Sequence, residues 1–139
     1  MPDSGEAALG TLLREMQPML CSDPYTFCVI QHRADLPPQL RVFATVHEEE
    51  GITIIAPEID VIQSGLSGSG SWARISLNIH SALSAVGLTA AVSGALAAVG
   101  ISANVLAGHY HDHLFVPWKR RQQAFSVLKQ LTGLRADTE

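Results

Sequence analysis

Apolar residues recur with a helical or a strand period along most of the first half of the chain. Over Glu6–Met16 they are spaced three and four residues apart, which predicts an amphipathic helix. Three runs rich in aromatic and β-branched residues follow and are typical of strands. These runs are Tyr25–Gln31, Arg41–His47 and Ile52–Pro57. After them, the segment Glu58–Gln63 has room for one or two helical turns. The pattern predicts the order α-β-β-β-α.

The second half has the clearest pattern. Trp72–His80 alternates between apolar and polar residues, which predicts a strand with one buried face. A loop over Ser81–Gly87 leads into a helix over Leu88–Val99, whose second face carries only small residues and is typical of a helix packed on both sides. Gly100 is a natural end for this helix. The remaining elements are strands over Ile101–Gly108 and Asp112–Pro117 and a helix over Lys119–Leu131.

The predicted order in the second half is β-α-β-β-α, the core of the ferredoxin-like split arrangement. A fourth strand is missing after its last helix, and we expect the first half to supply one. The Gly- and Ser-rich stretch Ser64–Ser71 is the best internal boundary. The sequence therefore predicts an α+β fold with an antiparallel sheet and helices on one face. Two related halves, 1–65 and 71–135, are expected to pack as one module.

Composition changes this picture in four ways. Charged residues make up 16% of the 139 residues, against about 25% in typical soluble domains, which favours a surface covered by a second copy and hence a homodimer. The net charge of −4 offers no basic field for nucleic acid. Cys21 and Cys28 fit reduced thiols in the cytoplasm. The apolar stretch Ile75–His111 is interrupted by polar residues and glycines, so we expect no membrane span.

Three histidines alternate in "HYHDH", at His109, His111 and His113. This run falls one residue short of the H-x-H-x-D-H signature of metallo-β-lactamase-like hydrolases, and no histidine follows it. A simpler zinc site needs imidazoles that converge. We expect the chain to turn around Tyr110–Asp112, which would break their shared face. We therefore predict neither metal ligands nor a cofactor. No G-x-S-x-G motif is present, and we expect no catalytic residues.

The stretch "VGLTAAVSGALAAVGISANV" resembles the helix and following strand of an ACT domain. Together with its flanks, the resemblance covers most of residues 71–132 and is similar to the ACT repeats of aspartate kinases. The whole chain also resembles small bacterial stand-alone proteins that combine an N-terminal half ending in "EEEGIT" with an ACT-like half ending in "HDHLFVP". The resemblance implies two ACT-like halves and no catalytic activity of their own.

ACT domains usually bind an amino acid or similar metabolite between two copies, and the resemblance implies a regulatory or sensing role. Carried onto this chain, the ligand loop contains Val86, Gly87, Leu88 and Thr89, with Asn104 on the next strand and His80 at the end of the preceding one. Unpaired N–H groups at the helix start favour a carboxylate, and an asparagine offers both a donor and an acceptor. Two alternatives remain open at this point: a dimerisation module without ligand, and a metal-dependent enzyme using the three histidines.

Overall fold

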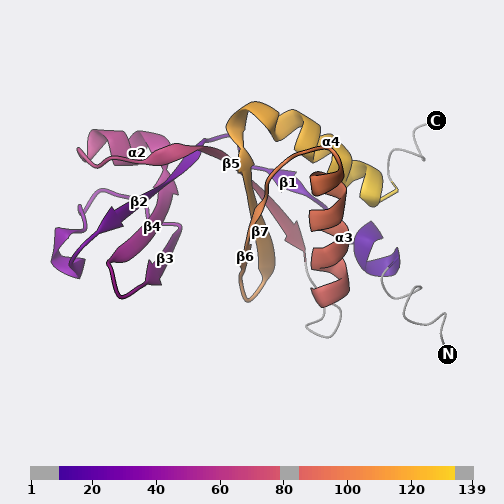
Figure 1. The fold of residues 1–139 in the computed structure, drawn as a ribbon, viewed down its shortest axis with the longest axis horizontal. Coiled ribbons are helices and arrows are strands. Elements are labelled where there is room, and N and C mark those ends of the chain that lie inside the picture. Colours follow the sequence, from indigo (N-terminus) through magenta and orange to yellow (C-terminus); the bar gives the residue numbers. More distant parts are fainter. Residues whose placement is uncertain (1–9, 79–84, 134–139) are drawn as a thin grey trace. The chain divides into compact units, whose positions relative to one another are not determined.

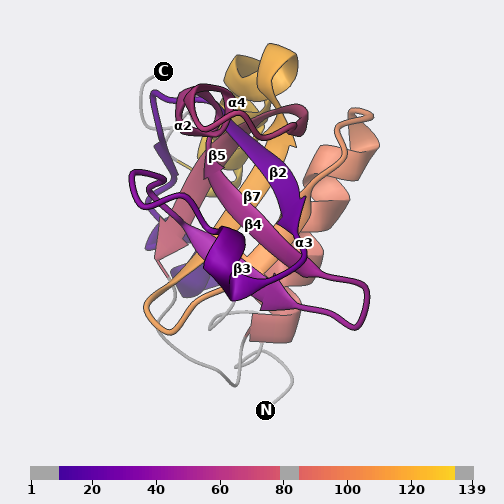
Figure 2. The same cartoon turned by 90° about the vertical axis from the view of Figure 1, so that its left-hand side faces the viewer.

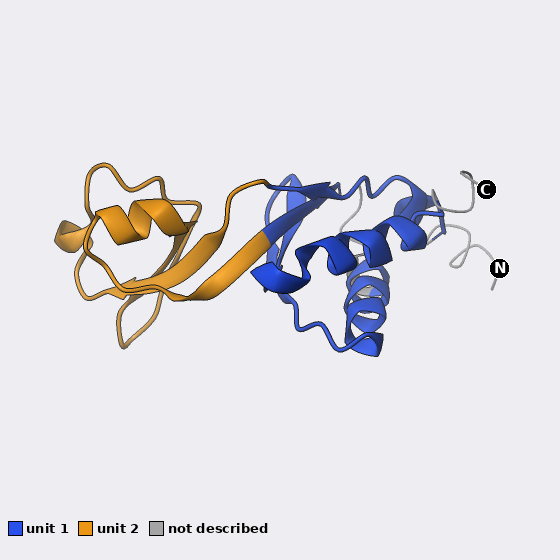
Figure 3. Cartoon of the chain, turned by 90° about the horizontal axis from the view of Figure 1, so that it is seen from above, with its two compact units in different colours: residues 1–21, 74–139 blue, residues 22–73 orange. Residues whose placement is uncertain are grey.

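A computed structural model describes residues 10–78 and 85–133 of the chain (Figure 1). The chain divides into two compact units (Figure 3). Unit 1 consists of residues 1–21 and 74–139, and unit 2 of residues 22–73. The start of the first predicted helix and the predicted loop residues 81–84 lie outside the described residues. The two halves expected from the sequence, 1–65 and 71–135, stay a prediction.

Unit 2 is built on four antiparallel strands in the spatial order β3-β4-β2-β5 (Figure 2). They are β2 (Tyr25–Ile30), β3 (Ala44–His47), β4 (Ile52–Pro57) and the first part of β5 (Ser69–Asn78). Taken in chain order within this unit, the spatial order is 2-3-1-4, which is ferredoxin-like. The helix normally found after the first strand is reduced to the 3-10 turn η1 (Arg33–Asp35), and α2 (Glu58–Gln63) follows β4.

The core of unit 2 lies between its sheet and α2. The central strands β2 and β4 contribute Cys28, Ile30, Ile54 and Ala56, and α2 contributes Val61, its only buried residue. Each large aliphatic side chain buried in this way contributes about 1.5–3 kcal/mol to folding. The β-branched composition of β4 therefore accounts for its central place in the sheet.

Unit 1 has a second ferredoxin-like sheet, in the spatial order β1-β5-β7-β6. It joins the second part of β5 to β6 (Asn104–Ala107) and β7 (His111–Pro117). The missing fourth strand is β1 (Met19–Leu20), which pairs with β5 through Met19 opposite Ser76 and Leu20 opposite Ile75. The N-terminal segment therefore completes the sheet of the second half, as the sequence led us to expect.

Two helices pack against each other in unit 1, α3 (Ala85–Ala98) and α4 (Arg121–Leu131), the latter preceded by the 3-10 turn η3 (Trp118–Arg120). Leu88, Val92 and Leu96 of α3 are buried, as are Ala124 and Leu128 of α4. These residues follow the three- and four-residue spacing that predicted each helix. No helix in residues 10–78 and 85–133 is long and apolar enough to cross a bilayer.

The strands of unit 1 alternate between two faces, as their sequence pattern predicts. On β5, Ile75 and Leu77 are buried while Arg74, Ser76 and Asn78 are only partly buried. On β7, Asp112 and Leu114 share one face, and His111 and His113 lie on the other. Leu77, Asp112 and Leu114 face residues of α3. The face of Arg74 and His113 is therefore the one turned away from this helix.

Several predicted boundaries are shifted by tertiary contacts. Helix α3 begins at Ala85 instead of Leu88, and β5 begins at Ser69, inside the predicted boundary loop Ser64–Ser71. Strands β3 and β6 are shorter than predicted, beginning at Ala44 and Asn104. Pairing with neighbouring strands decides where the strands begin and end. A residue with strand propensity forms part of a strand only where a neighbouring strand offers hydrogen bonds.

The hairpin between β6 and β7 turns earlier than predicted. Gly108 N–H donates to the His111 carbonyl over 2.8 Å, and Ala107 pairs with Asp112. The turn residues are therefore His109 and Tyr110, and the prediction of a turn around Tyr110–Asp112 was wrong. The physical reason is that Asp112 belongs to the buried face of β7, where it is only 5% exposed.

Candidate functional site

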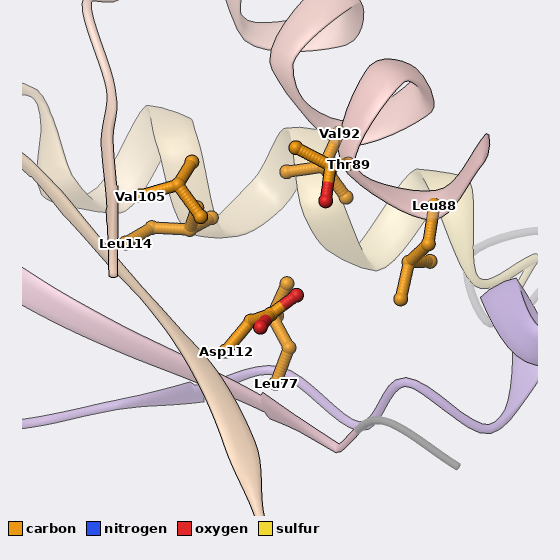
Figure 4. Close-up of a pocket in the computed structure, with 7 residues that line it drawn as sticks. All are labelled: Leu77, Leu88, Thr89, Val92, Val105, Asp112 and Leu114. Atoms are coloured by element: carbon orange, nitrogen blue, oxygen red, sulfur yellow. The ribbon is translucent and has the colours of Figure 1, made fainter. Parts of the chain in front are cut away.

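A small cavity lies between α3 and the sheet of unit 1 (Figure 4). Its volume is about 10 Å³, at the lower limit for a single water molecule. Strands β5, β6 and β7 supply one wall and the first two turns of α3 supply the other. The lining residues are Leu77, Leu88, Thr89, Val92, Val105, Asp112 and Leu114.

Asp112 is the one ionisable residue among those that line this cavity. Burial raises the pKa of its carboxyl above the ordinary value of 3.8, because a charged group loses hydration there. Within residues 10–78 and 85–133, no hydrogen bond to this carboxylate is found. Figure 4 shows the Asp112 carboxylate and the Thr89 hydroxyl both directed into the space between β7 and α3. Desolvation disfavours the ionised form of this carboxyl group, and a cationic or donor group of a ligand would offset that cost.

The first turn of α3 forms the opposite wall. Helices leave their first N–H groups without intrahelical partners, and the helix dipole makes this end positive. Leu88 is buried and Thr89 half-buried in this region, and Gly87 lies just before them with no bulky side chain. The cavity therefore sets the buried carboxyl group of Asp112 near the first turn of α3, whose N–H groups attract anions.

The structure brings together some of the predicted site residues. Leu88 and Thr89 line the cavity, and Gly87 is half-buried in the same helical turn. Val86 lies in α3, and only its backbone is described. Asn104 is exposed at the start of β6, and its neighbour Val105 reaches the cavity. His80 lies outside the described residues. Ligand contact by these six residues stays a prediction.

Sequence reasoning missed Asp112, which it placed where the hairpin turn meets the following strand. The signal was present in the spacing, because Asp112, Leu114 and Val116 follow one another at every second position. A strand that begins at His111 puts all three on one face, and all three are buried. A carboxylate on the apolar face of a strand is the pattern that marks a candidate site.

The histidines are arranged differently from the prediction. His111 and His113 do share one face of β7, with ring centroids 6.1 Å apart, whereas His109 lies in the turn against Tyr110. The expectation of broken parity was wrong for this pair, because the turn ends before His111. Among residues 10–78 and 85–133, however, no three His, Cys, Asp or Glu side chains are grouped to hold a metal ion.

His113 takes part in a hydrogen-bonded chain with β5. Arg74 Nη1 donates to Ser76 Oγ over 2.8 Å, and Ser76 Oγ lies 2.7 Å from His113 Nδ1. Arginine only donates, so Ser76 Oγ accepts from Arg74, and its contact with Nδ1 joins the serine to the imidazole ring. Burial, Arg74 and His111 all lower the pKa of His113 from its ordinary 6.5, which favours its neutral form.

The cysteines show no sign of catalytic activation. Both are free thiols, Cys28 buried and Cys21 half-buried. Burial raises the pKa of the Cys28 thiol, which disfavours the reactive thiolate. A nucleophilic role for Cys28 therefore finds no support in its surroundings.

Comparison with known protein families identifies the class to which this fold and cavity belong. Residues 4–70 match one profile of the ACT domain, and residues 69–130 match a second. The chain belongs to the ACT domain family and carries two ACT domains in tandem. ACT domains are commonly regulatory domains that bind small ligands, not catalytic domains.

Solved structures similar to the chain agree with this family. A crystal structure of a Vibrio cholerae protein of unknown function, described as a "possible transport protein", is 41% identical. The match covers 92% of this chain and 98% of that one, with a TM-score of 0.82. The ligand-free regulatory subunit of aspartate kinase from Thermus thermophilus matches at 11% identity. That match covers 84% of this chain and 97% of the subunit, with a TM-score of 0.61. A comparison with curated proteins found no match.

Proposed function

We propose that this protein is a non-catalytic regulator that binds an amino acid beside the first turn of α3 in unit 1. The observation that carries the proposal is the buried carboxylate of Asp112, which lies in a cavity beside a helix start. The ligand ammonium pairs with Asp112, and the ligand carboxylate accepts N–H groups from the turn that contains Val86 and Gly87. An ammonium beside a buried carboxylate forms charge-assisted hydrogen bonds, which are stronger than neutral ones.

The cavity of about 10 Å³ is too small for an amino acid as it stands. Binding therefore requires the first turn of α3 to move or a second copy to complete the site. In the proposal, Leu88 and Thr89 border the enlarged site. Asn104 precedes Val105 on β6, so strand alternation turns it to the other face of the sheet, away from this site. Ligand contact by His80 stays a prediction from the resemblance. Glycine at position 87 suits close approach by a ligand, because it presents no Cβ.

The proposal includes a homodimer formed through α3. The outward side of this helix bears only small residues that are exposed, Ala90, Gly94, Ala97 and Ala98. The whole helix Ala85–Ala98 has no charged residue, which is unusual for a face left in water. The proposal also places the protein in the cytoplasm, where Cys21 and Cys28 persist as free thiols.

A thermal-shift panel of the twenty amino acids tests ligand binding. We expect one group of amino acids to raise the melting temperature of the wild-type protein. An N-acetylated form of the best ligand should fail, because it lacks the ammonium that pairs with Asp112. Asp112→Asn should abolish the shift, whereas Asp23→Asn, at an exposed aspartate of unit 2, should leave it unchanged.

Two outcomes would contradict this function. If no amino acid changes the melting temperature while the protein is dimeric, the alternative of a dimerisation module without ligand is favoured. If Asp112→Asn and Asp23→Asn respond equally to the ligand, binding does not involve the cavity. Light scattering after size-exclusion chromatography tests the dimer separately. There, Ala97→Glu should produce monomers, and Gln122→Glu on exposed α4 surface should not.

A further inference from the structure

A second and larger hollow lies on the opposite face of the unit 1 sheet. Its volume is about 360 Å³, within the range of sites for small molecules. Strand β5, the start of β7 and the segment that contains β1 form its walls. The lining residues are Met19, Leu20, Cys21, Arg74, Ser76, Asn78, His111 and His113. We call this hollow the Arg74 cleft.

The Arg74 cleft gathers hydrogen-bond donors. Arg74 is partly buried and its guanidinium is held at Nη1 by the hydroxyl of Ser76. Asn78 contributes an amide whose Nδ2 donates to Gln17 Oε1 over 2.8 Å. His111 is exposed and its ring lies 6.1 Å from that of His113. Since Ser76 bridges Arg74 and His113, the positions of these groups are mutually constrained.

The described residues that line the cleft carry positive charge and no negative charge. None of the described residues that line it is an aspartate or glutamate, although acidic residues outnumber basic ones by 13 to 9 in the chain. Arg74 carries a permanent positive charge, and His111 and His113 each gain one on protonation. Met19, Leu20 and Cys21 supply an apolar side next to these polar groups. A local excess of positive charge on an acidic protein marks a place where an anion is attracted.

We propose that the Arg74 cleft binds a small anion that carries a carboxylate or phosphate group. The planar guanidinium of Arg74 presents paired N–H donors that match two oxygens of such a group. His111 and Asn78 are placed to donate to the remaining oxygens, and Ser76 holds the arginine in position. The apolar wall accepts the carbon skeleton of an organic acid or phosphate ester.

This cleft is separate from the proposed amino-acid cavity. Asp112 and His113 are adjacent on β7, so their side chains lie on opposite faces of the sheet. Asp112 lines the cavity under α3, and His113 lines the Arg74 cleft. The two sites can therefore fail independently in experiments.

Anion binding should be stronger at lower pH. Among the described residues that line the cleft, the charged and titratable groups beside His113 are Arg74 on β5, His111 on β7 and Cys21 just beyond β1. A bound anion offsets the repulsion that Arg74 and His111 exert on a protonated His113. Because the pKa of His113 in the free protein lies below its ordinary 6.5, affinity should increase as the pH falls below 6.5.

Nuclear magnetic resonance of the histidine rings in the full chain tests the proposal. The signals of the six histidines are followed while inorganic phosphate and, separately, succinate are added in an anion-poor buffer. We expect the His111 and His113 signals to shift saturably with at least one of these probes. A response to phosphate indicates a phosphate ester, and a response to succinate an organic acid.

Two pairs of variants locate the site. Arg74→Gln should weaken binding by about tenfold or more, because it removes a charge-assisted contact. Lys119→Gln, which removes the same charge at an exposed position outside the cleft, should change affinity by less than about twofold. His111→Gln should weaken binding, and His109→Gln in the neighbouring turn should not. If Arg74→Gln does not fold, Arg74→Lys keeps the charge but loses the paired donors and should show an intermediate loss.

Three results would overturn the proposal. The first is the absence of a saturable shift of His111 and His113 with either probe. The second is an equal loss of affinity in Arg74→Gln and Lys119→Gln, which indicates general attraction of anions to positive charge. The third is a saturable response of the same histidines to zinc alone, with no response to either anion. Asp112→Asn should leave anion binding intact, which separates this test from that of the amino-acid cavity.

Discussion

At the scale of single residues, two neighbours on β7 have different surroundings because their side chains lie on opposite faces of the sheet. Asp112 and His113 are neighbours, and burial disfavours the charged form of both. Asp112 faces the cavity under α3, where no hydrogen bond compensates for its burial among the described residues. His113 faces the other side of the sheet, where Ser76 binds its Nδ1. Asp112 and His113 therefore have different surroundings although they are adjacent in the chain.

Asp112→Asn should increase the stability of the ligand-free protein at neutral pH. Because the folded-state pKa of Asp112 is raised, folding favours its protonated form. The resulting stability is fully present below the ordinary pKa of 3.8 and is lost as pH rises through the folded-state value. The variant should therefore exceed the wild type in unfolding free energy at pH 7 and match it near the acid limit. Urea denaturation across this pH range measures the difference, and Asp23→Asn should show no such trend.

Gly68→Ala should destabilise unit 2. A Cβ at position 68 would overlap the side chain of Thr26, which is 1% exposed and donates to the Gly70 carbonyl over 2.7 Å. Overpacking of this kind typically costs about 1–3 kcal/mol. Gly94→Ala in the middle of α3 meets nothing within 4 Å in a single protomer, and in the monomeric Ala97→Glu background it should stabilise by about 0.5–1 kcal/mol. Chemical denaturation of both variants checks this, and equal effects would contradict the packing argument.

At the scale of elements, the end of α3 is determined by residues far apart in the chain. Gly100 has a φ of +74°, and Ile101 N–H donates to the Leu96 carbonyl while Gly100 N–H donates to that of Ala97. This is a Schellman motif, with Ile101 and Leu96 both buried as the motif requires. Arg120 then donates to the carbonyls of Val99 and Gly100. Arg120 therefore helps to cap the C-terminal end of α3.

Gly100→Ala should destabilise the protein by about 1–2 kcal/mol, because an alanine in the left-handed region is strained. Arg120→Gln should cost less, about 0.5–1.5 kcal/mol, through loss of its bonds to the helix end. Thermal and urea unfolding measure both effects. Lys119→Gln is the matched control, since Lys119 is exposed and next to Arg120 in sequence. A loss in this control as large as in Arg120→Gln would contradict the capping role.

At the scale of the whole molecule, unit 1 is assembled from two segments of chain that flank unit 2 in sequence. The strand β1 has only two residues, yet its neighbourhood makes further bonds to β5. Cys21 N–H donates to the Arg74 carbonyl, and Asn78 N–H donates to that of Met16, which is fully buried. The segment Met16–Cys21 is therefore joined to the second ACT-like sheet.

A shortened chain that begins at residue 22 should lose stability selectively in unit 1. Trp118 reports on unit 1 and Trp72 on unit 2, so single-tryptophan versions made with Trp→Phe changes can separate the two transitions. We expect the Trp118 fluorescence transition to move to lower urea while the Trp72 transition moves little. Met19→Ala keeps the backbone of β1 and is 68% exposed, so it should change stability by no more than about 0.5 kcal/mol. Equal shifts of both transitions would contradict the division into units.

Much of the fold could be predicted because the elements carry strong periodic patterns. Two elements were predicted at their observed bounds, the strand Ile52–Pro57 and the helix Glu58–Gln63. The strand is a nearly continuous apolar run, and the helix is a charged turn that directly follows it, so both patterns leave little ambiguity. The candidate site was harder to predict. Leu88 and Thr89 could be named from the family resemblance, whereas Asp112 could not be recognised without the position of the hairpin turn.

The sequence by itself determined the elements and their inward faces, because hydrophobic periodicity is a property of neighbouring residues. It also carried the ACT resemblance, through the small-residue helix that ends at Gly100. Only the tertiary structure decided that β1 completes the sheet of the second half, that Asp112 lies under α3 and that Arg74, Ser76 and His113 are joined. These contacts depend on strand register, and a change of one residue in register moves every side chain to the other face.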